Sequence, residues 1–166
     1  MKIYKGSLTY QDYNDLIKNN FIFSEKLLTK QIQPSSLDLT LSEECYEIKA
    51  SFLTPKTKIR DKLDNIVNQK IDLSKTYVLK KNITYIAKLN EKLNLENNIF
   101  GKCNPKSSTG RLDIFCRTIL NFSDEYEKIP LNYNGEIFLE ITPRSFNIAL
   151  KKGDSLNQMR LIHQNH

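Results

Sequence analysis

The segment Gly135–Ile141 reads Gly-Glu-Ile-Phe-Leu-Glu-Ile, and polar and apolar residues recur in it with a period near two. Successive side chains of a β-strand point to opposite faces, so Glu136, Phe138 and Glu140 share one face. The isoleucines and the leucine between them share the other face, which the pattern predicts to be buried. The segment is therefore expected to form a half-buried β-strand, and we place it at residues Glu136–Thr142.

The same period recurs upstream, where Leu37, Leu39 and Leu41 alternate with Asp38 and Thr40. Other short strands are expected at Tyr46–Lys49, Tyr77–Leu79, Ile83–Leu89, Ile99–Cys103, Leu112–Ile119, Phe146–Leu150 and Gln158–Ile162, with a turn at Lys151–Asp154 between the last two. Many short strands separated by turn residues are typical of an all-β barrel or sandwich.

One helix is expected near the N-terminus, over about residues 9–21. Thr9 can cap it, Asp12 follows three residues later, and Tyr13 and Leu16 begin an apolar repeat with helical spacing. The stretch Thr54–Lys70 is ambiguous, because its apolar residues have helical spacing within a very polar context. We interpret it as either a short helix or an insertion loop.

The composition indicates one globular domain spanning residues 1–166, with 39% hydrophobic and 27% charged residues. The formal net charge is +6, but lysines supply most of the positive charge and are spread along the chain. This spread, without a tight basic cluster, argues against a nucleic-acid surface. No apolar run is long enough for a membrane span, and the N-terminus lacks the hydrophobic region of a signal peptide. A cytoplasmic protein without a membrane or nucleic-acid partner is therefore expected.

The cysteines and histidines argue against a zinc site. Cys45, Cys103 and Cys116 are odd in number and widely spaced, which fits reduced thiols in a cytosol better than disulfides. No Cys-x-x-Cys pair occurs, and Cys103 and Cys116 fall in expected strands, where core thiols are commoner than nucleophiles. His163 and His166 lie at the extreme C-terminus, where a disordered tail is expected.

The polar run Asn104–Asp113 is the densest group of candidate functional residues. It reads Asn-Pro-Lys-Ser-Ser-Thr-Gly-Arg-Leu-Asp. Consecutive hydroxyl residues and glycine can present hydroxyl and N–H groups on one concave turn, and such turns bind anions. Lys106 and Arg111 flank that turn with positive charge. The run is consistent with a phosphate cradle, but the composition alone favours an ordinary β-turn beside a solvated lysine, because such turns are common.

Glu140 is the second candidate. An acid on a strand usually lies on the solvent-exposed face, and that is the simpler interpretation here. The alternative is that Glu140 lies near a polar turn at the end of a barrel strand and serves as a general base.

Six blocks of sequence occur in a characteristic order: Gln31–Leu39, Tyr46–Pro55, Asn104–Asp113, Tyr133–Gly135, Leu139–Glu140 and Leu156–Arg160. The last four, in this order, resemble the dCTP deaminase branch of the dUTPase-like superfamily. The two upstream blocks further resemble the N-terminal half of a long bacterial form built from two dUTPase-like halves.

The resemblance implies a mainly β fold: a dUTPase-like antiparallel barrel, or distorted jelly roll, with a short N-terminal helix. It also implies hydrolytic deamination of dCTP to dUTP without zinc, with Mg²⁺ bound through the substrate triphosphate. Such barrels usually form homotrimers that share active sites between subunits, and this chain could instead assemble with a C-terminal half.

The resemblance also implies roles for individual residues between positions 104 and 160. Lys106, Ser107 and Ser108 match the phosphate-binding run, and Ser107 matches the serine that helps to place the attacking water. Arg111 matches an essential arginine, Glu140 the proton-carrying glutamate and Gln158 a glutamine that contacts the nucleotide. A neighbouring arginine is expected to keep the Glu140 carboxylate ionised and to orient it.

Three departures from the family pattern leave other functions open. Lys106 stands where the family usually has arginine, and Glu127 is the candidate for an aspartate that often precedes the turn at Tyr133–Gly135. The sequence also ends six residues after Arg160, whereas family members continue into a lid or a second half. The alternatives are a dUTP diphosphohydrolase and a catalytically silent nucleotide-binding half.

Overall fold

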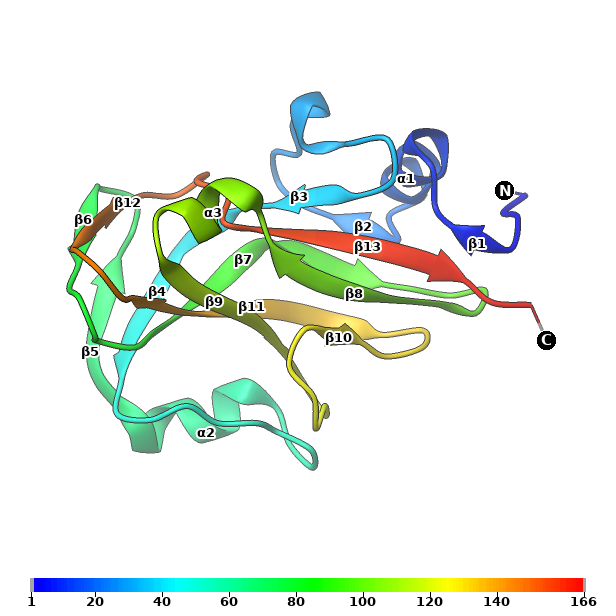
Figure 1. Cartoon of the computed structure of the whole chain (residues 1–166). Coiled ribbons are helices and arrows are strands. Elements are labelled where there is room, and N and C mark those ends of the chain that lie inside the picture. Colours follow the sequence, from blue (N-terminus) through cyan, green and yellow to red (C-terminus); the bar gives the residue numbers. More distant parts are fainter. Residues whose placement is uncertain (1, 166) are drawn as a thin grey trace.

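The computed structural model describes residues 2–165, and β-strands dominate it (Figure 1). The strands are β1 (Gly6–Ser7), β2 (Ile22–Phe23), β3 (Leu37–Leu39), β4 (Leu41–Ile48), β5 (Val67–Asp72), β6 (Tyr77–Leu79), β7 (Tyr85–Asn94), β8 (Ile99–Pro105), β9 (Ile114–Leu120), β10 (Lys128–Ile129), β11 (Asn134–Pro143), β12 (Ile148–Leu150) and β13 (Asn157–His163). The helices are α1 (Tyr10–Lys18), α2 (Ile59–Ile66) and α3 (Ser107–Arg111), with a 3-10 turn η1 (Thr29–Gln31). Among residues 2–165, no helix is long and apolar enough to cross a membrane.

Two antiparallel sheets pack against each other. The five-stranded sheet has the order β1-β13-β8-β10, with β3 also paired to β13. The six-stranded sheet has the order β5-β4-β7-β11-β9, with β2 also paired to β7. In Figure 1, β13 and β8 form one layer, β7, β9 and β11 lie in the next, and α2 lies beyond that second layer. Strands β6 and β12 form a separate two-stranded ribbon.

Helix α1 begins where the sequence predicts and ends earlier. The Thr9 N–H donates to Asp12 Oδ2 at 2.8 Å and the Asp12 N–H donates to Thr9 Oγ1 at 3.4 Å, which completes the capping box. The helix ends at Lys18, and Asn20 takes a positive φ of 60°, a conformation that asparagine tolerates. Tyr13 and Leu16 are fully buried, so the predicted apolar repeat is confirmed.

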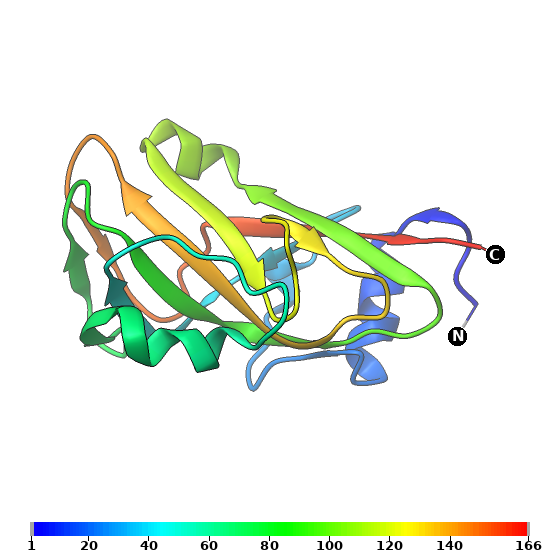
Figure 2. The ribbon, with the colours of Figure 1, turned by 90° about the horizontal axis from the view of Figure 1, so that it is seen from below.

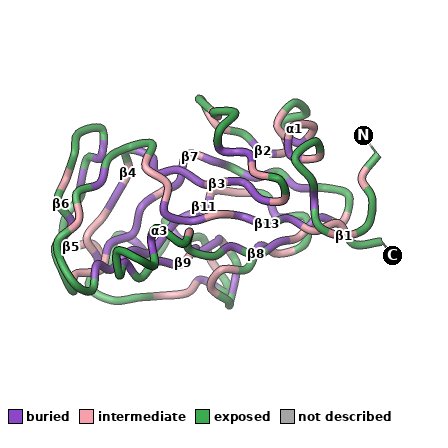
Figure 3. The backbone as a smooth tube through the Cα atoms, turned by 45° about the horizontal axis from the view of Figure 1, so that its top comes forward, coloured by how far each residue is buried: buried purple, intermediate pink, exposed green. Residues whose placement is uncertain are grey.

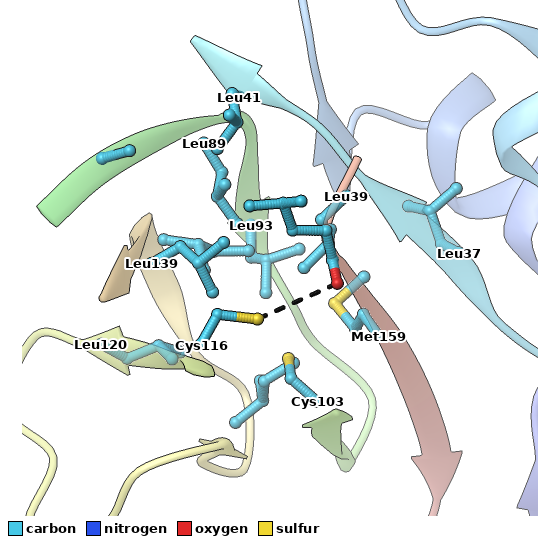
Figure 4. Packing of buried hydrophobic residues seen from close by; sticks show 14 of the residues in the cluster. Leu37, Leu39, Leu41, Leu89, Leu93, Cys103, Cys116, Leu120, Leu139 and Met159 are labelled. Carbon is cyan, nitrogen blue, oxygen red and sulfur yellow. Dashed lines mark hydrogen bonds between the residues drawn. The ribbon is translucent and has the colours of Figure 1, made fainter. Parts of the chain in front are cut away.

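The main core lies between the inner faces of the two sheets (Figure 3). Figure 4 shows Leu39, Cys103 and Met159 of one sheet close to residues such as Cys116 of the other. The Cys116 thiol lies 3.9 Å from the Leu156 carbonyl oxygen. Burial raises the pKa of both Cys103 and Cys116 to about 12, so these thiols stay protonated at neutral pH. The prediction that they are core thiols is confirmed.

A second apolar cluster covers the outer face of the six-stranded sheet. Helix α2 lies across that face (Figure 2) and packs its buried Ile59 and Leu63 against sheet residues that include Phe138. Arg60, on the same helix, forms ion pairs of 2.8 Å with Glu44 and 2.9 Å with Glu136. The outer face of β11 is therefore covered over part of its length.

Two expectations differ from the structure. The stretch Thr54–Lys70 does contain a short helix, but its last residues belong to β5, which was not predicted. In β5 only Ile71 is buried, so the strand lacks a clear alternating pattern. His163 is part of β13, where it pairs with Gly6 and Ile99, so the expectation of a disordered tail is wrong there. His166 lies outside the described residues.

Candidate functional site

An open cleft of about 560 Å³ lies on the outer face of the five-stranded sheet. Three residues in register contribute to its lining: Gln158 of β13 pairs with Asp38 of β3 on one side and with Asn104 of β8 on the other. Their neighbours Leu39 and Met159 are buried in the core. Because side chains alternate along a strand, the three polar residues point away from the core.

Lys106 and Ser107 line the same cleft, where β8 leads into α3. Lys106 Nζ lies 3.1 Å from Asp38 Oδ2, and this ion pair keeps the ammonium at the cleft. An ammonium on a flexible stem can bind a phosphate as a point charge. The structure thus brings together three of the residues assigned by resemblance, Lys106, Ser107 and Gln158.

The polar run Ser107–Arg111 forms one turn of helix, α3, where the sequence analysis expected a concave turn or a β-turn. Two hydrogen bonds hold this helix to the segment before β13. Thr109 Oγ1 donates to the Leu156 carbonyl oxygen at 2.7 Å, and the Lys106 N–H donates to the same oxygen at 3.0 Å. Because Thr109 is buried, the exposed Ser107 and Ser108 lie on an anchored support.

Glu140 lies on the outer face of the six-stranded sheet and is only 1% exposed. The prediction that its side chain lies in solvent is wrong, because Arg117 and the aromatic residues around it cover that side chain. Arg117 is opposite Glu140 in the β9–β11 pairing, and its Nε donates to Glu140 Oε2 at 2.7 Å. The other oxygen, Glu140 Oε1, is buried and has no hydrogen-bond partner among the described residues.

An arginine was expected beside Glu140, and Arg111 is not that arginine. Within residues 2–165, the guanidinium that contacts Glu140 belongs to Arg117. Arg111 is exposed at the end of α3, and it does not line the cleft of Lys106 and Ser107. The structure therefore places the predicted site residues in three positions: the cleft, the exposed end of α3 and the buried Glu140.

The family model for the 2'-deoxycytidine 5'-triphosphate deaminase (DCD) N-terminal domain matches residues 4–165. The chain belongs to this dCTP deaminase family. It is 30% identical over 151 residues to a protein of Coprothermobacter proteolyticus named "dCTP deaminase, dUMP-forming". That match covers 87% of this chain and 75% of the relative.

The crystal structure of 2'-deoxycytidine 5'-triphosphate deaminase from Agrobacterium tumefaciens is similar to this chain, with a TM-score of 0.92 and 40% identity. The similarity covers 95% of this chain and 46% of that one, so this chain spans less than half of the Agrobacterium protein. A weaker likeness, with a TM-score of 0.43 and 21% identity, is to the native EIAV dUTPase. The predicted family and the predicted antiparallel β fold are confirmed.

Glu127, the candidate for the dCTP deaminase aspartate, points into the protein and not into the cleft. Its Oε1 accepts hydrogen bonds from the Thr118 N–H and from Asn157 Nδ2, the latter at 3.2 Å. Burial raises the pKa of Glu127 above its ordinary value. Its Oε2 is buried and has no hydrogen-bond partner among the described residues. This geometry favours a role inside the fold over one at the nucleotide.

Glu91 is a buried acid of this dCTP deaminase domain that the sequence analysis missed. Its carboxylate accepts hydrogen bonds from Thr40 Oγ1 at 2.6 Å and from Gln31 Nε2 at 2.9 Å. Gln31 Nε2 also donates to the Asp38 carbonyl oxygen at 3.0 Å, which links Glu91 to a strand that lines the cleft. Burial raises the pKa of Glu91. The signal in the sequence was the alternation of β7, because Leu89 and Leu93 point inward on either side of Glu91.

Proposed function

We propose that the chain binds dCTP and carries the proton-transfer group of its hydrolytic deamination to dUTP and ammonia. One observation carries this proposal: Glu140 is buried, one of its oxygens is held by Arg117, and the other is free to accept a proton. Buried polar atoms without partners are rare in native proteins, and a catalytic role is one of the explanations for them. The names of the Coprothermobacter and Agrobacterium relatives support the choice of dCTP as substrate.

The chemistry needs one group that both accepts and returns protons. A water oxygen bonds to the cytosine ring carbon that carries the amine, Glu140 accepts a water proton, and it passes that proton to the adjacent ring nitrogen. Glu140 then moves the proton of the new hydroxyl to the amine, the carbon–nitrogen bond breaks, and ammonia leaves as the carbonyl forms. A positioned proton carrier of this kind contributes about 10²–10⁴-fold to the rate.

The rest of the catalysis would come from placing the substrate and the water. Lys106, Ser107 and Gln158 would bind the phosphates and the nucleoside in the cleft, with Ser108 beside them on α3. Ser107 would also help to place the attacking water, and Arg111 would contribute positive charge from the end of α3. Holding water and substrate in a reactive geometry lowers the entropic part of the barrier.

The complete site would form between two domains. The cleft of Lys106 lies on the outer face of one sheet, and Glu140 lies on the outer face of the other, so the two groups face away from each other within one chain. A second copy of the chain, as in a homotrimer, or a C-terminal half would bring the cleft of one domain to the Glu140 of another. Exposed apolar residues beside α3, Leu112 and Phe115, are suited to such a contact.

Magnesium would enter with the substrate. Among residues 2–165, no three His, Cys, Asp or Glu side chains are grouped so that they could hold a metal ion. The acid that lines the cleft, Asp38, is engaged by Lys106. The cleft around Asp38 and Lys106 therefore fits an Mg²⁺ ion that the triphosphate carries. Such an ion would neutralise part of the phosphate charge.

A second candidate function is a deaminase whose final product is dUMP. The printed name of the Coprothermobacter relative, "dUMP-forming", favours it. This reaction adds hydrolysis at the α-phosphate, which releases pyrophosphate and needs a second activated water.

The test is to incubate the purified chain with dCTP and Mg²⁺, alone and with a candidate C-terminal half, and to resolve the products by anion exchange. We expect dUTP with one ammonia per nucleotide, and dUMP with pyrophosphate would support the second candidate. Nucleotide binding without turnover in either assembly would contradict catalysis and support the silent half. Native mass spectrometry of the same samples would give the number of chains in the active assembly.

Glu140→Gln tests the proton carrier, and Glu136→Gln is the matched control. Glu136 lies on the same strand and the same face, but it is paired with Arg60. Glu140→Gln should lower kcat by about 10²–10⁴-fold with nucleotide affinity nearly unchanged, since only proton transfer is removed. Glu136→Gln should keep its activity. Wild-type turnover by Glu140→Gln would exclude Glu140 as the proton carrier.

A further inference from the structure

Arg117 is held in one orientation by aromatic side chains. Its guanidinium carbon lies 3.5 Å from the centroid of the Tyr126 ring and 5.1 Å from that of Phe115. Tyr126 is itself fixed, because its hydroxyl donates to the Phe52 carbonyl oxygen at 3.3 Å. Phe115 also lies 5.6 Å from the guanidinium carbon of Arg144. Contacts between guanidinium groups and aromatic rings are favourable and restrict the arginine side chain.

This fixed guanidinium engages one oxygen of Glu140 and leaves the other free. The contact joins Arg117 Nε and Glu140 Oε2, and register in the β9–β11 pairing places the two residues opposite each other. Glu140 Oε1 has no hydrogen-bond partner in the described part of the chain, although it is buried. The two oxygens of one carboxylate are therefore not equivalent.

We propose that Arg117 is a positioning residue for Glu140, which holds Oε2 so that Oε1 is the oxygen that accepts and returns the proton. This inference rests on the proposed deaminase function and deepens it. Tyr126 and Phe115 act through Arg117. Their rings fix the plane of its guanidinium group, and that plane sets the direction of the Nε–H bond. A freely rotating carboxylate would present either oxygen in many orientations, and proton transfer depends on one of them.

The proposal distinguishes a guanidinium from a simple positive charge. Lysine at position 117 would keep the charge, but an ammonium has neither the planar shape nor the fixed Nε–H direction. The side chain of Arg117 is 27% exposed, so a small cation can reach the space that a truncated side chain would leave. Arg144 offers a matched control, because it contacts Phe115 as Arg117 does, whereas the guanidinium bound to Glu140 belongs to Arg117.

The test measures kcat and KM for dCTP in whichever assembly makes the wild type active. Arg117→Lys and Arg117→Ala should each lower kcat at least about tenfold and leave KM within about threefold, since a positioning residue acts on the chemical step. Arg144→Ala should match the wild type within about twofold. Added guanidinium ion, at concentrations well below those that unfold the protein, should restore kcat of Arg117→Ala and leave Arg144→Ala unchanged.

A second measurement does not depend on turnover. The NMR resonance of the Arg117 Nε–H should move when Glu140 is changed to Gln, and the Arg144 resonance should stay. If the wild type deaminates dCTP and both Arg117 variants keep its kcat, the positioning role is wrong and the proposed function stands. If the wild type deaminates dCTP in no assembly, both the positioning role and the proposed function are wrong. Should Arg117→Ala fail to fold, Arg117→Lys decides between these results.

Discussion

Removing one buried hydroxyl, by Tyr13→Phe, should weaken the attachment of α1 to β13. Tyr13 is fully buried, and its hydroxyl oxygen accepts a hydrogen bond from the Leu161 N–H at 2.8 Å. Phenylalanine keeps the ring and its packing but leaves that N–H buried without a partner. Such a loss costs about 1–3 kcal/mol. For a domain of this size, each kcal/mol lowers Tm by roughly 2–4 °C, so the expected fall is about 2–12 °C.

Urea unfolding and calorimetry at one fixed protein concentration would measure this effect, with Tyr10→Phe as the control. Tyr10 lies on the same helix and is 43% exposed, so its change should stay within about 0.5 kcal/mol. Hydrogen exchange gives a second measure, because the Leu161 amide should lose protection in Tyr13→Phe alone. If the two variants unfolded at the same urea concentration and the amide stayed protected, the hydrogen bond would contribute nothing and the reasoning would be refuted.

Two further changes test other parts of the fold. Burial raises the pKa of Glu127 above its ordinary 4.5, so the folded state holds that proton more tightly than the unfolded state does. Wild-type stability should therefore fall as pH rises from 4.5 through the folded-state pKa, and Glu127→Gln should gain in Tm relative to the wild type over that range. A Tm difference independent of pH would contradict this. In Gly101→Ala, the new Cβ would lie 2.6 Å from the Arg160 carbonyl oxygen, so a loss of about 1–3 kcal/mol is expected in urea unfolding. Gly110→Ala, which meets no heavy atom within 4 Å, is its control and should cost nothing; equal midpoints would disprove the clash.

Strands with clear alternation could be predicted from the sequence, and those without it could not. Residues Tyr77–Leu79 were predicted with the observed bounds, and β11 was predicted within two residues of its observed ends. Strand β5 was missed because it lies at the edge of its sheet and buries only Ile71. Its pairing with β4 joins residues that are 19 to 28 positions apart, from Ile48 with Val67 to Glu44 with Asp72, and local sequence does not specify such a pairing.

The candidate site shows the same limit at the level of single residues. The face of Glu140 was predicted correctly, because alternation determines it. The burial of Glu140 was not predicted. Arg117 and Tyr126 cover it only once β9 and β11 have paired in one register, and a long connection separates these two strands. Such cross-strand pairs depend on the register between strands, and a single sequence gives no direct measure of that register.

The position of β13 bears on how the chain is made. This strand lies between β8 on one side and β1 and β3 on the other, yet it follows all three of them in the sequence and leaves the ribosome after them. Tyr13 must find Leu161, which is 148 positions away. At about 5–20 residues per second, synthesis of that interval takes roughly 7–30 s. For that time Tyr13 of α1 lacks its hydrogen-bond partner on β13, so we expect the nascent chain to depend on chaperones until β13 is released.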